Sequence, residues 1–379
     1  MKTARIYFKN LDALRFLAAF AVLISHVGQL TELLGYSHFF SSLSQPLVTG
    51  ETGVLLFFSL SGFLITYLLL AEEKQCGTIG LKNFYIRRAL RIWPLYFLTI
   101  ILALFIYPLI DFLHFKDYNT GFIWSRLPLK LLFYFLLMPG IVMDFLGFVP
   151  YASHTWTIGA EELFYFIWPL LLLKAKNKAA AIIWFIIIYL AVYFLLYFYP
   201  SPGKIPAALL LICTRYPVSC MAIGGFFAYI ALTDTAPTNV IRKIMYTAVC
   251  QAAVYILILV FVIFKVNLAC LNNEVYAILL GYLVFNMATN PNRLFNIDNR
   301  VMNYLGKISY GLYMFHPLAI AIAVKCCVYM NWTSVPLLYT LAFTVTVLLA
   351  AVSYHLYEIR FIRKKKAYTR IPSGEPFSQ

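Results

Sequence analysis

Two ionisable residues, Arg15 and His26, lie eleven positions apart in the first apolar segment, LDALRFLAAFAVLISHVGQL. A helix turns about 100° per residue, so both side chains share one face, about 16 Å apart along the axis. Ionisable groups on one face of a membrane span are costly and by default mark a site that faces the protein interior. Each residue alone is equally well explained as an interfacial anchor or a satisfied polar group.

Three arginines enter a later apolar segment, FYIRRALRIWPLYFL, as Arg87, Arg88 and Arg91. Arg87 and Arg91 are one helical turn apart and share a face. Basic residues here are ordinary anchors at the cytoplasmic surface. Three guanidinium groups are also a good phosphate receptor, because their planar forks bind phosphate oxygens bidentately. The cluster therefore favours a cytosolic ligand with several phosphates.

Two other segments carry polar groups into apolar surroundings. HTWTIGAEELFYFIWPLLLL opens with Glu161 and Glu162, which need partners or an aqueous cavity. Adjacent residues point about 100° apart, so only one of the two carboxylates can face the same cavity directly. LGKISYGLYMFHPL holds Tyr310, Tyr313 and His316, and a helix with such polar chemistry usually faces a cavity, although interhelical hydrogen bonding explains part of the pattern.

The composition is that of a membrane protein. The 379 residues are 62% hydrophobic and 12% charged, whereas soluble domains are about 25% charged. The fold class that we expect is all-α, a polytopic transmembrane helix bundle of about ten spans with one re-entrant or interfacial helix. The expected spans are 11–30, 52–71, 92–113, 155–173, 179–199, 207–232, 244–266, 269–289, 304–325 and 335–358.

The net charge of +15 reports topology rather than a nucleic-acid partner. With the N-terminus inside, most basic residues fall in cytoplasmic segments, which is the positive-inside pattern, and both termini are then cytoplasmic. The apolar segment 127–145 is interrupted by Pro139-Gly140. Counting it as a crossing would invert every later loop, so we interpret it as a re-entrant or interfacial element packed against protein. Eleven spans is the alternative.

We expect one membrane domain, residues 1–360, followed by a short basic tail, 361–379, of disordered composition. Lys364–Lys366 are expected to anchor the last span at anionic lipid. The seven cysteines show no paired metal spacing, so no metal site is expected. The expected location is the inner (plasma) membrane, with multiple passes.

Five blocks, in order, resemble the acyltransferase-3 family, integral-membrane enzymes that mainly O-acylate sugars of bacterial surface polysaccharides. LDALR with His26 resembles the family's LDGLR and its R-x10-H pair, and GVLLFFSLSGFLI, which contains Ser61, resembles GVxxFFxxSGFLI. RRALRIWPLY resembles RR-x-x-R-x-x-P-x-Y. HTWTIGAEELFYFIWPLL resembles W-S-L-x-x-E-E-x-F-Y-x-x-x-P, with Thr157 for serine, and ISYGLYMFHPL resembles SY-x-x-Y-x-x-H. Ala13 replaces a glycine, and YHLYEIRFIRKK departs from the usual E-R-P ending, so Glu358 receives no role.

The resemblance implies a membrane O-acyltransferase, in a stand-alone form without an SGNH hydrolase domain. It would move an acyl group, most often acetyl, from cytoplasmic acyl-CoA to a hydroxyl of a surface glycan or lipid-linked sugar. His26 would be the general base or carry a transient acyl-imidazole. Glu161 would orient that imidazole or polarise the acceptor, and Arg15 would attract the donor's negative groups. The CoA phosphates would bind Arg87, Arg88 and Arg91, and the possible cavity residues are Ser61, Tyr310, Tyr313 and His316.

The partners so implied are acyl-CoA as co-substrate, a glycan acceptor and the lipid bilayer, with no bound cofactor. The main alternative is a transporter or flippase of a glycan precursor, which polar stripes and broken helices also suit. A third interpretation is a scaffold protein of a surface-polymer assembly, but such a protein would not need buried histidine and arginine side chains. The acceptor, the acyl chain length and the oligomeric state stay open.

Overall fold

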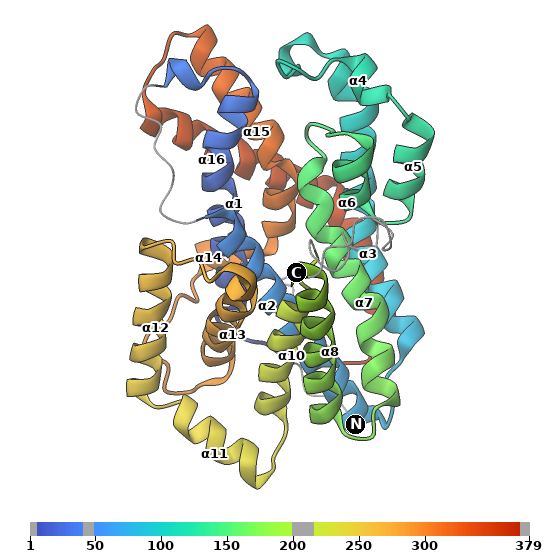
Figure 1. Cartoon of the computed structure of the whole chain (residues 1–379), viewed down its shortest axis with the longest axis vertical. Helices are drawn as coiled ribbons and strands as arrows, with labels where there is room; N and C mark the ends of the chain where they lie inside the picture. Colours follow the sequence, from blue (N-terminus) through green and yellow to red (C-terminus); the bar gives the residue numbers. More distant parts are fainter. Residues whose placement is uncertain (1–5, 41–48, 199–215, 372–379) are drawn as a thin grey trace.

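The computed structural model describes residues 6–40, 49–198 and 216–371 of the chain (Figure 1). The described part is helical, and its only β-type pairing is an isolated bridge between Phe115 and Tyr118. The predicted all-α class is therefore confirmed. The longer helices are α1 (Leu11–Leu33), α2 (Gly50–Cys76), α3 (Leu81–Ile101), α7 (Trp156–Lys174), α8 (Lys178–Phe198), α10 (Val218–Leu232), α11 (Ala236–Met245), α12 (Ala248–Ile263), α13 (Asn272–Thr289), α15 (Ser309–Tyr329) and α16 (Val335–Ser353).

Within the described residues, seven helices are long and apolar enough to cross a membrane, or eight if one bent pair counts as a span. The chain is thus a multi-pass membrane protein. The count of ten stays a prediction, for three local reasons. Helix α10 bends by 107° into α11, and residues 207–215 of the expected span 207–232 lie outside the described ranges. Helix α12 has only 16 residues, and α13 is too polar for the same test.

The segment 127–145 is broken, as Pro139-Gly140 predicts. Helix α5 (Leu127–Phe135) ends four residues before the short α6 (Pro139–Ile141), and a wide turn follows over Val142–Leu146. Leu137 between the helices has a φ of 58°, a left-handed conformation that a continuous helix does not allow. This segment therefore forms no continuous helix of membrane-spanning length.

Helix α2 lies at the centre and packs against α1, α7, α10 and α13. Glycine permits the closest of these contacts. A Cβ on Gly62 would lie 1.8 Å from the backbone oxygen of Met221 in α10, and one on Gly224 of α10 would lie 2.3 Å from that of Ser59. Because apolar helices in lipid gain little from the hydrophobic effect, such close backbone packing is a principal source of their association.

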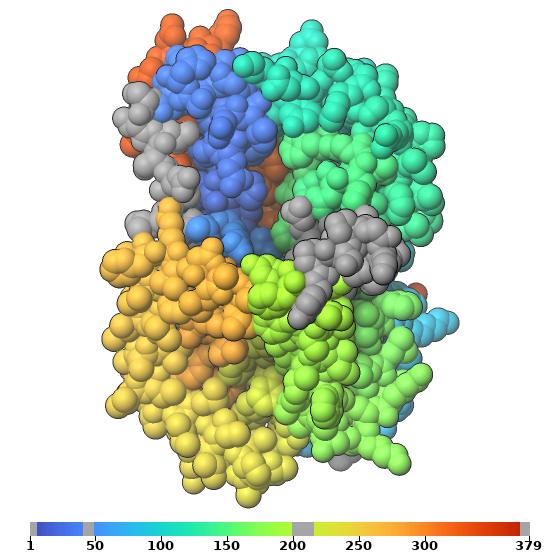
Figure 2. Space-filling view, in the orientation of Figure 1, coloured from blue at the N-terminus to red at the C-terminus, as the bar shows by residue number. Residues whose placement is uncertain are grey.

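Helices α8 and α12 form part of the lower periphery on the face shown in Figure 2. In α8 only Ile182 and Leu196 are buried, and in α12 only Gln251. Their exposed side chains are almost all large and apolar. Such helices fit a lipid-facing position, because their backbone groups are satisfied internally and their side chains need no water.

The chain beyond residue 360 differs from the expected disordered tail, because helix α17 (Ile359–Lys365) crosses that boundary. It packs along α3, and the backbone oxygen of Tyr368 accepts a 2.8 Å hydrogen bond from Arg87. Arg370 then lies 3.6 Å from Glu72 at the end of α2. These charged contacts order the segment up to residue 371, which composition alone does not reveal.

We predict that Gly62→Ala destabilises the bundle, because the added methyl group would force α2 and α10 apart. Overpacking of this kind costs about 1–3 kcal/mol. Gly121→Ala is the matched control, because a Cβ there meets only the Asn119 side chain at 3.5 Å. The measurement is the thermal transition of detergent-purified protein. Equal transitions for both variants would contradict the close packing of α2 and α10.

Candidate functional site

Three histidines meet inside the bundle. The centroid of the His26 ring from α1 lies 4.9 Å from that of the His316 ring of α15, and the His154 ring lies 5.0 Å from the same His316 ring. His154 comes from a short 3₁₀ turn, Ser153–Thr155, that leads into α7. His154 and His316 are buried and His26 is half-buried. The structure thus unites two predicted residues with a histidine that the sequence did not single out.

Hydrogen bonds fix the tautomer of two of these rings. His26 Nδ1 lies 2.8 Å from the backbone oxygen of Val22, and His316 Nδ1 lies 2.6 Å from that of Tyr313. A carbonyl only accepts, so each Nδ1 carries the proton and each neutral ring keeps a lone pair on Nε2. The Tyr313 oxygen is free for this bond because Pro317, four residues later, has no N–H to donate to it.

A second polar group lies around Glu161, where α2 meets α7. Ser61 Oγ donates to one carboxylate oxygen at 3.1 Å, and the Tyr165 hydroxyl donates to the other at 2.8 Å. The Ser61 and Tyr165 hydroxyls also lie 2.9 Å apart. Of the two adjacent carboxylates, Glu161 is the one that takes part in this group, while one oxygen of Glu162 is buried without a hydrogen-bond partner among the described residues.

One stripe of α7 and its leading turn connects the two groups. His154, Thr157, Glu161 and Tyr165 are spaced by three, four and four residues, so they face the same side of the helix. The Tyr313 hydroxyl completes the connection, because it donates to the His154 backbone oxygen at 2.7 Å and lies 2.8 Å from Thr157 Oγ1. We call these connected side chains the polar column; they are His26, His154, His316, Tyr313, Thr157, Glu161, Ser61 and Tyr165.

The three arginines of α3 have three different surroundings. Arg87 pairs with the buried Glu72 at 3.3 Å. Arg91 lies 4.0 Å from Glu358 and faces the ring of Tyr310. Two of the three arginines therefore already have a carboxylate partner.

Arg88 points to the polar column, where its guanidinium lies 5.8 Å from the Tyr165 ring centroid. Its Nε is buried without a partner in the part of the chain that the structure describes.

Arg15 and Arg88 both lie within electrostatic range of Glu161, at the end of the polar column away from the histidines. Arg15 also forms an ion pair with Asp12, one turn earlier on α1. The α1 stripe that the sequence predicts therefore runs alongside the column, with Arg15 near one end and His26 at the other. A cationic end and an imidazole end are joined through hydroxyl and carboxylate groups.

Tyr310, a predicted cavity residue, has its hydroxyl committed to the backbone oxygen of Ile92 at 2.8 Å. Its ring centroid lies 5.8 Å from the Arg91 guanidinium. Glu358 is buried beside Arg91 and accepts from Ser353 at 3.3 Å. Sequence analysis assigned Glu358 no role because the usual family ending is missing, yet the carboxylate lies 4.0 Å from Arg91 and balances its charge.

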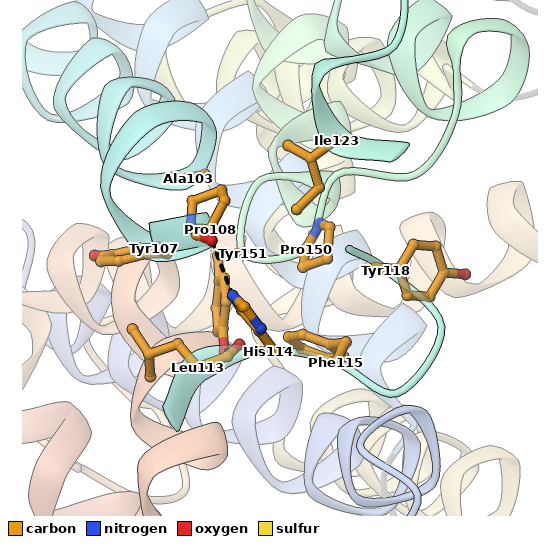
Figure 3. A pocket seen from close by; sticks show the side chains of 10 residues that line it. All are labelled: Ala103, Tyr107, Pro108, Leu113, His114, Phe115, Tyr118, Ile123, Pro150 and Tyr151. Carbon is orange, nitrogen blue, oxygen red and sulfur yellow. Dashed lines mark hydrogen bonds between the residues drawn. The ribbon is translucent and has the colours of Figure 1, made fainter. Parts of the chain in front are cut away.

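Within the described ranges, no group of three His, Cys, Asp or Glu side chains is arranged to hold a metal ion. A small cavity lies elsewhere, between the end of α3 and the loop that contains His114 (Figure 3). Its size allows about one water molecule. His114 Nε2 is bonded to the backbone oxygen of Pro108 at 2.8 Å, and no column residue lines the cavity. We therefore give this cavity no part in the site.

Comparison with known proteins identifies the family. The model of the acyltransferase-3 family, described as an acyltransferase domain, matches residues 8–355. The chain belongs to the acyltransferase-3 family. The match covers every residue of the polar column and all three arginines of α3, whereas α17 lies beyond it.

Relatives in this family carry acetyltransferase names. A protein of Staphylococcus aureus (strain COL) named "Putative O-acetyltransferase" is 24% identical over 98% of this chain and 60% of its own length. The peptidoglycan O-acetyltransferase OatA of Listeria monocytogenes is 30% identical over 45% of this chain and 25% of its own length. The chain therefore spans 60% or less of the length of these two curated relatives. No solved structure matches.

Proposed function

We propose that the protein is a membrane O-acyltransferase that transfers an acetyl group from cytoplasmic acetyl-CoA to a hydroxyl of a surface glycan or lipid-linked sugar. The family and the names of the relatives support acyl transfer. The proposal is carried by one observation, the polar column that joins an arginine end to three imidazoles inside an apolar bundle. A scaffold protein has no need for such a buried arrangement.

His26 is the proposed general base. Its Nε2 lone pair accepts the proton of the acceptor hydroxyl while that oxygen attacks the thioester carbonyl. The carbon–sulfur bond then breaks, and the same proton passes from His26 to the CoA thiolate. The bond from His26 Nδ1 to the Val22 oxygen holds the ring in this tautomer and stabilises the charged imidazolium. Attack by Nε2 itself, to give an acyl-imidazole, uses the same lone pair and is the second route.

The acceptor hydroxyl is proposed to bind between the imidazoles. The Nε2 atoms of His154 and His316 are buried and have no hydrogen-bond partner among the described residues. Buried nitrogens without a partner are rare because each one loses its hydrogen bond to water. A sugar carries several hydroxyl groups, so one hydroxyl can donate to such a nitrogen while a neighbouring hydroxyl gives its proton to His26 and attacks the thioester. This arrangement supports a hydroxylated acceptor at the histidine end.

The donor is proposed to enter at the arginine end. Arg88 and Arg15 lie there, and the axial distance of about 16 Å between Arg15 and His26 has to be covered by an extended arm. The pantetheine arm of CoA is linear and carries its thioester at the tip. Phosphates at the arginine end therefore place the reacting carbonyl near the histidines.

We predict that His26→Ala lowers acetyl transfer by about 10² to 10⁴-fold, the usual contribution of a general base. Expression and membrane insertion should be unchanged, because an apolar span loses only one polar group. The measurement is radiolabelled acetyl incorporation by purified protein. Wild-type incorporation by His26→Ala would overturn both routes through this imidazole.

We predict that Arg88→Gln raises the apparent KM for acetyl-CoA with a smaller change in kcat, because contacts to distant phosphates form equally in the ground and transition states. Arg87→Gln is the matched control. It removes the same charge at the neighbouring position, but its side chain is already paired with Glu72 and with the backbone oxygen of Tyr368. The control should therefore lower thermal stability and leave the KM nearly unchanged. A raised KM for Arg87→Gln together with an unchanged KM for Arg88→Gln would contradict the proposed donor end.

A further inference from the structure

The charges at the arginine end do not balance. Arg15 pairs with Asp12, Arg87 and Arg370 share Glu72, and Arg91 lies beside Glu358. Arg88 lies within electrostatic range of Glu161 and Glu162 but forms no ion pair with either among the described residues, and its Nε is buried without a hydrogen-bond partner there. Arg88 is therefore a cation without an ion pair of its own.

A second cation, Lys365, joins this group from the C-terminal helix α17. It lies within electrostatic range of Arg15, Arg87, Arg88 and Arg91. Its side chain is half-buried and forms no ion pair or side-chain hydrogen bond with the residues that the structure describes. From the sequence we expected Lys365, together with its neighbours Lys364 and Lys366, to anchor the last span at anionic lipid.

The helix geometry explains why Lys365 points to α3. Glu358 and Lys365 are seven residues apart, two helical turns, so they share one face. Glu358 on that face meets Arg91, and the Tyr368 oxygen farther along meets Arg87. Lys365 shares the face of Glu358 and therefore lies on the side of α17 that meets Arg91, within electrostatic range of the α3 arginines.

Converging cations that form no ion pair are costly in an apolar surrounding, because each one loses hydration and repels its neighbours. A ligand with several negative charges removes this cost. We infer that Lys365, together with Arg88 and Arg15, forms a binding site for a ligand with several phosphate groups, and that α17 is a structural part of that site. The inference rests on the proposed function, in which this ligand is the CoA part of the donor.

Direct binding of acetyl-CoA to the purified full-length protein tests this assignment, with acetyl-pantetheine, which lacks the nucleotide phosphates, as the second probe. Lys365→Gln should weaken acetyl-CoA binding about ten-fold or more, the usual effect of losing a charge-assisted hydrogen bond. It should leave the binding of acetyl-pantetheine unchanged. Lys365→Arg should retain most of the affinity because it keeps the charge.

Lys364→Gln is the matched control, because this neighbouring side chain is exposed and its loss changes the net charge equally. It should bind acetyl-CoA as the wild type does. Equal affinities of Lys365→Gln and Lys364→Gln, at wild-type thermal stability, would overturn the role of Lys365. Absence of acetyl-CoA binding in the wild-type protein would instead overturn the proposed donor, so the two failures are distinguishable. If Lys365→Gln lowers stability, Lys365→Arg at normal stability but with weakened binding also contradicts the assignment.

Discussion

The arrangement of this bundle depends on how ionisable side chains are partnered inside apolar surroundings. A buried charge without a partner is so unfavourable that each one needs an opposite charge, several hydrogen bonds or a ligand. Glu72 and Glu358 hold Arg87 and Arg91 and thereby fasten α2 and the C-terminal segment to α3. Glu161 is instead satisfied by hydroxyl groups. Arg88 and Lys365 form no ion pair with the described residues, and the buried Nε of Arg88 has no hydrogen-bond partner there.

The close approach of the central helices makes that partnering possible. Gly62 and Gly224 bring α2 and α10 into backbone contact, and α2 in turn places Ser61 against Glu161 of α7. At the other end, α1 and α15 bring His26 and His316 within 4.9 Å between ring centroids. The chemistry of the polar column therefore depends on small residues that have no chemical role of their own.

Local patterns in the sequence revealed much of this arrangement. The α1 stripe of Arg15 and His26, the expectation that only one of Glu161 and Glu162 faces the site, and the break at Pro139-Gly140 all follow from helix periodicity and proline chemistry. His154 was missed because it precedes its helix, and only the packing against α15 gives it a role. A further signal was present, since His154, Thr157, Glu161 and Tyr165 follow a single helical stripe.

The features that the sequence does not reveal concern contacts between distant parts of the chain. Arg87 and Arg91 pair with Glu72 and Glu358, which lie far away in the sequence, and no local spacing reveals these pairs. The basic tail was interpreted as a lipid anchor from its composition. Its packing against α3, with the bond from Arg87 to the Tyr368 oxygen, joins residues that are far apart in the sequence. The number of spans stays a prediction, because seven or eight candidate spans lie in the described residues and hydropathy does not report the bend between α10 and α11.

The central claim is that the polar column joins a donor on one side of the membrane to an acceptor on the other. Sealed vesicles of known orientation, loaded with radiolabelled acetyl-CoA on one face and given a glycan acceptor only on the opposite face, test it most directly. The account predicts labelled acceptor when acetyl-CoA is on the cytoplasmic face, and none when the two sides are exchanged. Product formed only when both substrates share the cytoplasmic face would leave an acyltransferase but contradict transfer along the column.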